Sequence, residues 1–195
     1  MLPTVRLLFS LCALLVLGCG AAPQPTAQPV LRLDESAEVP RFDVPELERL
    51  VLRAVNRVRH EHQRAPLQPD TSLAAIARGH SQAMLDRAFF AHRDPDGLRA
   101  GDRARRARYA FQRLGENLFR GRLYDTVNTI RRGDHVQTVY LWHTPEDLAA
   151  LVAESWMESP GHRANMLSSA YDFGGIGIAT GPDFEVFVTL NLSAL

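Results

Sequence analysis

The chain has 195 residues, which is enough for one domain with a sizeable hydrophobic core but not comfortably enough for two. Its 22 basic side chains are all arginines and are balanced by 22 acidic side chains, so the formal net charge is +0. This balance argues against a dedicated nucleic-acid-binding protein, because such proteins carry an excess of clustered positive charge.

The N-terminus has the pattern of an export signal. Arg6 precedes the apolar run Leu7–Leu17, which is too short to span a membrane with margin. The run ends in Gly18-Cys19, and a small residue before such a cysteine is typical of a bacterial lipobox. We therefore predict that residues 1–18 are a lipoprotein signal peptide and that lipidated Cys19 anchors an exported protein in the bacterial cell envelope. The alternative is cleavage near Ala21-Ala22 and a freely secreted protein.

The next stretch, residues 19–44, is rich in proline, alanine and glutamine and lacks apolar periodicity. This composition predicts an extended tether. The only cysteines are Cys12 and Cys19, so residues 45–195 are predicted to form one domain without a disulfide, despite an oxidising destination.

Apolar residues at helical spacing predict three long helices. The first begins at Pro45 and ends before Pro66. Asp70 caps the second, which runs from Thr71 to about Ala88, and Thr144 caps the third.

Between the second and third helices, residues 99–113 are basic and include a short helix near Asp102. A phosphate or lipid-headgroup site is one interpretation of this stretch. We favour a solvated helix face, because no aromatic residues alternate with the arginines.

Strand patterns are concentrated in the C-terminal part of the chain. Residues 173–179 and 184–192 predict a hairpin whose turn is Gly181-Pro182-Asp183. The glycines of its first strand are expected to let a helix or ligand approach closely. Residues 135–142 alternate weakly as a strand, and Gly115-Glu116-Asn117-Leu118 opens another. Helices first and a hairpin last predict an α+β fold.

Three residues with metal-binding side chains each come next to a residue that marks the end or start of a helix or strand. His92 comes after Phe89-Phe90, Glu116 follows a glycine, and His162 lies just inside a helix that begins at Pro160. Two imidazoles and a carboxylate suit zinc with water in an open position. Neutral imidazole is the binding form, so we expect occupancy to fall below about pH 6.5.

Two further residues bear on this site. Ser159 is predicted to cap the helix that carries His162 with its hydroxyl. His80 lies on or beside the inward stripe of the second helix, so we expect it to be partly buried.

A series of motifs now points to a family. In chain order they are Asn56, Arg59, His62, Pro66-Leu67, Asp70, Ala77-Arg78-Gly79-His80-Ser81, Phe89-Phe90-Ala91-His92, Pro95-Asp96-Gly97, Gly115-Glu116-Asn117-Leu118, Trp156-Met157 and Ser159-Pro160-Gly161-His162-Arg163-Ala164-Asn165-Met166-Leu167. Together they resemble the bacterial branch of the CAP superfamily, named for cysteine-rich secretory proteins, antigen 5 and pathogenesis-related 1 proteins and also called the SCP domain. The match is in register from Leu47 to Leu192, except for an insertion at about 121–143.

The resemblance implies a three-layer α-β-α sandwich with a central, mainly antiparallel sheet and a surface cleft. In the family that cleft holds two histidines and two acids that can bind zinc. His92 and His162 match the histidines and Glu116 the first acid. The place of the second acid falls at Ser159, with Glu158 beside it. Ser159, Glu158, His80 and Asn117 are therefore expected as further cleft residues.

Family members are lipid or sterol binders, interaction modules and occasionally peptidases. We expect an envelope-anchored module that binds a small molecule, lipid or protein in its cleft, and a non-enzymatic role more than an enzymatic one. The alternative is a hydrolase acting outside the cytoplasm. It would use zinc-bound water with Glu116 as base, or Ser159 as nucleophile with His162 as base. In a third interpretation the histidines line a solvated cleft without metal.

Overall fold

A computed structural model of the chain describes residues 42–195, and these belong to one compact unit. The predicted signal peptide, Cys19 and most of the predicted tether lie outside the described residues. Within 42–195, no helix is both long enough and apolar enough to cross a membrane.

A four-stranded sheet forms the centre of the unit, in the order β1-β5-β6-β2. The strands are β1 (Gln68–Pro69), β2 (Arg113–Arg122), β5 (Phe173–Thr180) and β6 (Glu185–Ala194). The β5–β6 and β6–β2 pairs are antiparallel and only the short β1 runs parallel to its neighbour. The predicted C-terminal hairpin is confirmed, and β2 is left at the edge of the sheet.

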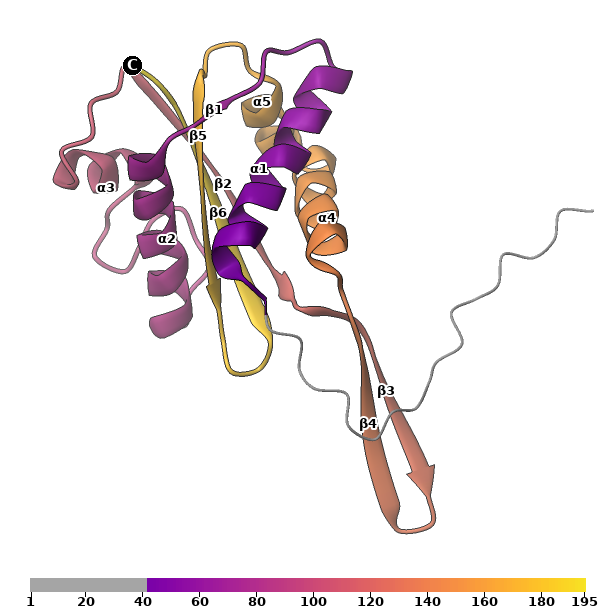
Figure 1. Cartoon of the computed structure of the whole chain (residues 1–195). Coiled ribbons are helices and arrows are strands. Elements are labelled where there is room, and N and C mark those ends of the chain that lie inside the picture. Colours follow the sequence, from indigo (N-terminus) through magenta and orange to yellow (C-terminus); the bar gives the residue numbers. More distant parts are fainter. Residues whose placement is uncertain (1–41) are drawn as a thin grey trace, which may run out of the picture. The chain divides into compact units, whose positions relative to one another are not determined.

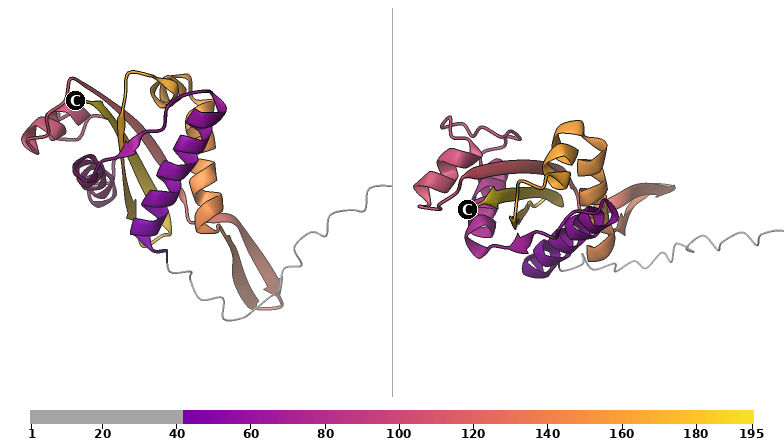
Figure 2. Two further views of the ribbon diagram at one scale, coloured as in Figure 1. Left: turned by 45° about the horizontal axis from the view of Figure 1, so that its top comes forward. Right: turned by 90° about the horizontal axis from the view of Figure 1, so that it is seen from above.

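Helices cover both faces of this sheet. Figures 1 and 2 show α1 (Val44–Glu61), α4 (Pro145–Glu158) and α5 (Pro160–Leu167) on one face, and α2 (Thr71–Asp86) and α3 (Ala100–Arg106) on the other. The α+β class and the three-layer α-β-α sandwich are therefore confirmed. Two predicted caps are also present, since Asp70 and Thr144 accept from the backbone N–H groups of Leu73 and Asp147.

The two layers pack differently against the sheet. On the α1/α4 face the core is large and apolar and includes the fully buried Trp156, whose indole N–H donates to the carbonyl of Leu118 at 2.9 Å. On the other face α2 lies almost on the backbone of β5. A Cβ added at Gly175 or Gly177 would lie 2.3 or 1.9 Å from a backbone nitrogen of α2, so only glycine fits. The predicted close approach of a helix is confirmed.

The predicted insertion contains a second, two-stranded sheet formed by β3 (Tyr124–Arg132) and β4 (His135–Trp142). It extends from the end of β2 as a long hairpin (Figure 1). Its base is fixed by a cluster of four aromatic rings, with centroids 4.9–6.3 Å apart, formed by Tyr124, Tyr140, Trp142 and Phe184. The strand predicted at 135–142 is confirmed, and its partner β3 was not predicted.

Candidate functional site

The candidate residues gather at the free edge of β2. Glu116 and Asn117 are consecutive in this strand, so their side chains point to opposite faces of the sheet. Glu116 reaches His92, which follows α2, whereas Asn117 reaches the first turn of α5, which carries His162. The edge strand thus brings together two histidines that come from the two helical layers.

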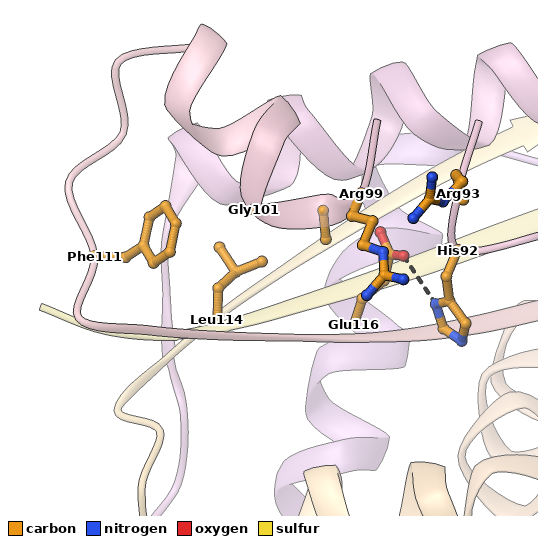
Figure 3. A pocket seen from close by; sticks show the side chains of 8 residues that line it. His92, Arg93, Arg99, Gly101, Phe111, Leu114 and Glu116 are labelled. Carbon is orange, nitrogen blue, oxygen red and sulfur yellow. Dashed lines mark hydrogen bonds and ion pairs between the residues drawn. The ribbon is translucent and has the colours of Figure 1, made fainter. Parts of the chain in front are cut away.

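On one face, Glu116 holds His92 through a hydrogen bond. His92 Nδ1 lies 2.9 Å from Glu116 Oε1, and Arg103 Nη2 donates to Oε2 at 2.6 Å (Figure 3 shows the first of these contacts). The Glu116 side chain is only 4% exposed, and the guanidinium compensates its buried charge. An ionised carboxylate only accepts hydrogen bonds, so next to it a neutral His92 imidazole has its proton on Nδ1 and its lone pair on Nε2.

On the other face, an amide network holds the first turn of α5. Asn117 Nδ2 donates to the carbonyl of His162 at 3.0 Å, and Asn165 Nδ2 donates to Asn117 Oδ1 at 2.9 Å. Burial first, and the neighbouring His92 second, lower the pKa of His162. The neutral imidazole, which is the form that binds metals, is therefore favoured at neutral pH.

The two imidazole rings are close to each other in a T-shaped arrangement. Their centroids are 6.1 Å apart with an interplanar angle of 63°. Between residues 42 and 195, no three histidine, cysteine, aspartate or glutamate side chains come together as a metal-binding group. Both oxygens of Glu116 already have protein partners, so the arrangement suits two histidine ligands with Glu116 orienting His92 behind them. The predicted set of His92, His162 and Glu116 as three ligands stays a prediction.

Ser159 and Glu158 make fewer contacts with the site than the sequence predicted. Ser159 is the N-cap residue of α5, but its hydroxyl makes no capping hydrogen bond, so that part of the prediction was wrong. Its backbone carbonyl accepts from Arg163 N–H instead. Glu158 is exposed at the end of α4. Neither side chain is hydrogen-bonded to His92 or His162 in the described structure.

His80 supports the segment that carries His92. It is 1% exposed, and its Nε2 lies 3.0 Å from the carbonyl of Ala91, the residue before His92. Its ring packs against Phe89, with centroids 5.8 Å apart. Burial lowers its pKa, so His80 is held neutral. His80 is more deeply buried than predicted, and its contact with the Ala91 carbonyl supports the segment that carries His92.

A pocket of about 540 Å³ opens beside His92 and Glu116 along β2 (Figure 3). Its lining consists of His92, Arg93, Arg99, Ala100, Gly101, Phe111, Leu114 and Glu116. Sequence reasoning missed Arg93, Arg99 and Arg103 as site residues. Arg99 and Arg103 lie in the basic stretch 99–113, whose interpretation as a solvated face did not separate arginines that face the site from those that do not, and Arg93 lies outside that stretch.

Known proteins share this fold and part of this sequence. An uncharacterised protein, YkwD, from Bacillus subtilis is 28% identical over 130 residues, which are 67% of this chain and 41% of that protein. An uncharacterised membrane protein, YlbC, from the same organism is 28% identical over 131 residues, covering 67% and 31%. The chain therefore spans less than half the length of these curated relatives.

Solved structures agree on the fold. An extracellular SCP-domain protein from Bacillus anthracis superposes with a TM-score of 0.57 at 24% identity, covering 81% of this chain and 45% of that one. An outer surface protein from Borrelia burgdorferi gives 0.61 at 15% identity, covering 80% and 98%. At these identities the likeness concerns the fold alone.

A family model decides the assignment. The model described as "Cysteine-rich secretory protein family" matches residues 52–192, which are well over half of the chain and include both histidines, Glu116 and Asn117. The chain therefore belongs to the CAP family of cysteine-rich secretory proteins.

Proposed function

We propose that this chain is an exported CAP protein that binds a ligand or partner in the cleft at the edge of β2. In this proposal His92 and His162 can hold a divalent metal ion such as zinc. The observation that carries it is the contact of 2.9 Å between His92 Nδ1 and the buried Glu116, which leaves Nε2 as the unengaged nitrogen of a ring whose centroid lies 6.1 Å from that of His162.

Such a bond is a common feature of metal-binding histidines. A carboxylate that accepts from Nδ1–H fixes the tautomer and orientation of the ring and raises its basicity as a ligand. Two imidazoles leave other coordination positions for water or for a group of the ligand. A bound zinc ion would supply a Lewis acid and an activated water at this place.

Calorimetric titration of zinc into the purified, chelator-treated full chain tests the metal pair. We expect one site, and we expect His162→Ala to weaken its affinity at least about tenfold. His60→Ala is a matched control, because His60 is an exposed histidine at the end of α1. Equal zinc affinity in wild type and His162→Ala would contradict the assignment.

Hydrolysis is the second candidate function. The lowered pKa of His162 supports it, because a neutral imidazole is available as a general base. Ser159, the other member of a Ser–His pair, shares no hydrogen bond with His162 within the described chain. Incubation with a peptide library, with and without chelator, separates the two functions, since cleavage that His162→Ala abolishes would replace binding as the main activity.

We also propose attachment to the cell envelope through Cys19. The apolar run that ends in Gly18-Cys19 supports it, and the extracellular and outer-surface proteins of similar fold support export. Metabolic labelling with an alkyne fatty acid is expected to mark wild type and to leave Cys19→Ser unlabelled. An unlabelled wild type in the culture medium would favour the freely secreted form.

A further inference from the structure

The pocket beside His92 carries positive charge that no direct ion pair in the described chain compensates. Arg93 and Arg99 line it, and neither side chain forms an ion pair with a residue between 42 and 195. The acids around them already have other partners. Glu116 and Asp94 face Arg103, Asp96 is paired with Arg87, and Asp102 with Arg105. Asp102 is close enough to Arg93 to interact with it electrostatically, but its direct partner is Arg105. The two exposed guanidinium groups of Arg93 and Arg99 therefore remain available to bind an anion.

The far end of the same pocket is apolar. Figure 3 shows Arg93, Arg99, His92 and Glu116 together at one end and Phe111 and Leu114 at the other, with Gly101 between them. The pocket therefore has a charged end and an apolar end along a single axis. Its volume, about 540 Å³, is in the range of small-molecule sites.

We propose that this pocket binds a small amphipathic anion. A carboxylate or phosphate head would be held by Arg93 and Arg99, because guanidinium groups match both anions with paired hydrogen bonds. A short unbranched apolar chain would then pass over Gly101 and lie against Phe111 and Leu114, where its burial is favourable. The proposal rests on the proposed ligand-binding cleft, and it needs no metal ion.

The shape of the pocket favours an anion with a tail over a bare anion. Inorganic phosphate would fill only the charged end and would leave the apolar walls in water. A neutral apolar molecule would leave the two guanidinium groups without a partner. The same head and tail occur in a soluble organic acid or phosphate and in a membrane lipid, so the test must separate these sources.

The main experiment titrates octyl phosphate into the chelator-treated full chain by calorimetry, with inorganic phosphate and octanol as reference ligands. We expect octyl phosphate to bind at least about tenfold more tightly than inorganic phosphate and octanol not to saturate. Arg93→Ala/Arg99→Ala is expected to weaken octyl phosphate at least about tenfold. Arg57→Ala/Arg64→Ala is the matched control, because it removes the same charge at two positions distant in sequence from the pocket.

A second variant tests the apolar end alone. A Cβ added at Gly101 would meet only ordinary contacts, 3.6–3.7 Å from the side chains of Arg105 and Phe111, so this position accepts a side chain, and circular dichroism checks that Gly101→Leu is folded. Its side chain would occupy the middle of the pocket. We expect octyl phosphate to lose its advantage over inorganic phosphate in this variant, while inorganic phosphate binds as in wild type.

A vesicle-binding experiment shows whether the ligand is a soluble molecule or a membrane lipid. Sedimentation with phosphatidylcholine vesicles, with and without phosphatidic acid, is run beside the titration. Binding to octyl phosphate alone supports a soluble ligand, whereas additional binding to phosphatidic acid that Arg93→Ala/Arg99→Ala abolishes supports a lipid head. Binding to neither, or equal affinity for octyl phosphate in wild type and Arg93→Ala/Arg99→Ala, overturns the proposal.

These outcomes stay distinct from a failure of the metal pair. Octyl phosphate is titrated without metal, and zinc is titrated without octyl phosphate. A chain that binds octyl phosphate but no zinc would keep this inference and reject the metal-binding part of the proposed function. A chain that binds zinc but not octyl phosphate would do the reverse.

Discussion

The two neighbouring residues Glu116 and Asn117 hold the two sides of the cleft in different ways. Glu116 forms a buried ion pair with Arg103 through Oε2, and its Oε1 contacts Nδ1 of His92 and orients that side chain. Asn117 belongs to a neutral amide network and fixes the backbone of His162. One side therefore depends on charge compensation and the other on hydrogen bonds between neutral groups.

The different contacts of Glu116 and Asn117 explain why the two histidines have different environments. The His92 side chain is 56% exposed, and its orientation comes from the carboxylate. His162 is half-buried, and its position comes from α5 as a whole. Changes on the Glu116 side should alter both charge and stability, whereas changes on the Asn117 side should alter geometry without altering charge.

Arg103→Ala is expected to have the largest effect. It would leave the carboxylate of Glu116 buried without its cation and would remove the donor to the carbonyl of Leu98, 2.9 Å away. Breaking a buried pair in this way costs about 3–5 kcal/mol of unfolding free energy. Urea denaturation measures it, with Arg106→Ala on the same helix as an exposed control. A loss below about 1 kcal/mol would mean that Glu116 is neutral or hydrated without Arg103.

Asn117→Ala is expected to cost less, about 1–3 kcal/mol, because it removes hydrogen bonds from a fully buried site without exposing a charge. A double-mutant cycle with Asn165→Ala should show coupling above about 0.5 kcal/mol, since the two amides contact each other. Additive losses would show that the network is not a unit. Asn128→Ala in the exposed hairpin is the control.

The comparison also shows what the sequence can predict. Helical spacing and capping residues predicted α1, α2 and α4, because these signals lie within a few residues of one another. The glycines of β5 predicted the close approach of α2, because a missing side chain has few other uses in a strand. The resemblance to the family supplied the layers and the pairing of His92 with His162 in one cleft.

The contacts that define the site could not be predicted from local patterns. Arg103 and Glu116 are 13 residues apart, and nothing in the basic stretch distinguishes Arg103 from Arg105 or Arg106 before the fold is known. Ser159 has the residue type and the position of an N-cap, but its hydroxyl is not used there. The β3 strand was missed because its alternation is weak and its face is largely exposed.

Zinc affinity offers a third way to separate the two sides of β2. Glu116→Gln keeps an acceptor near His92 Nδ1 but removes the charge, so it is expected to weaken zinc about 10- to 100-fold, as loss of an orienting carboxylate does. Asn117→Ala is expected to reduce the affinity for zinc less, because the Asn117 side chain forms no hydrogen bond with either imidazole ring and does not change its basicity. Glu158→Gln should also have a smaller effect, since Glu158 is exposed and bonded to neither histidine. A larger loss in Glu158→Gln would make that acid the missing member of the cleft.

The smallest expected effect is a pH dependence of stability that distinguishes His80 from His162. Burial lowers the pKa of both residues, so the unfolded chain takes up protons near pH 6.5 while the folded chain does not. Their full contribution to stability is therefore present above about pH 6.5 and is lost as pH falls toward the lowered folded pKa. His80 is 1% exposed and His162 half-buried, so His80→Gln should flatten the decline between about pH 6.5 and 5 more than His162→Gln does. Urea midpoints across this range, measured with chelator, test the order. A steeper decline in His80→Gln than in wild type would mean that the folded protein prefers the charged form of His80, with Glu116 as the nearby charge that favours it.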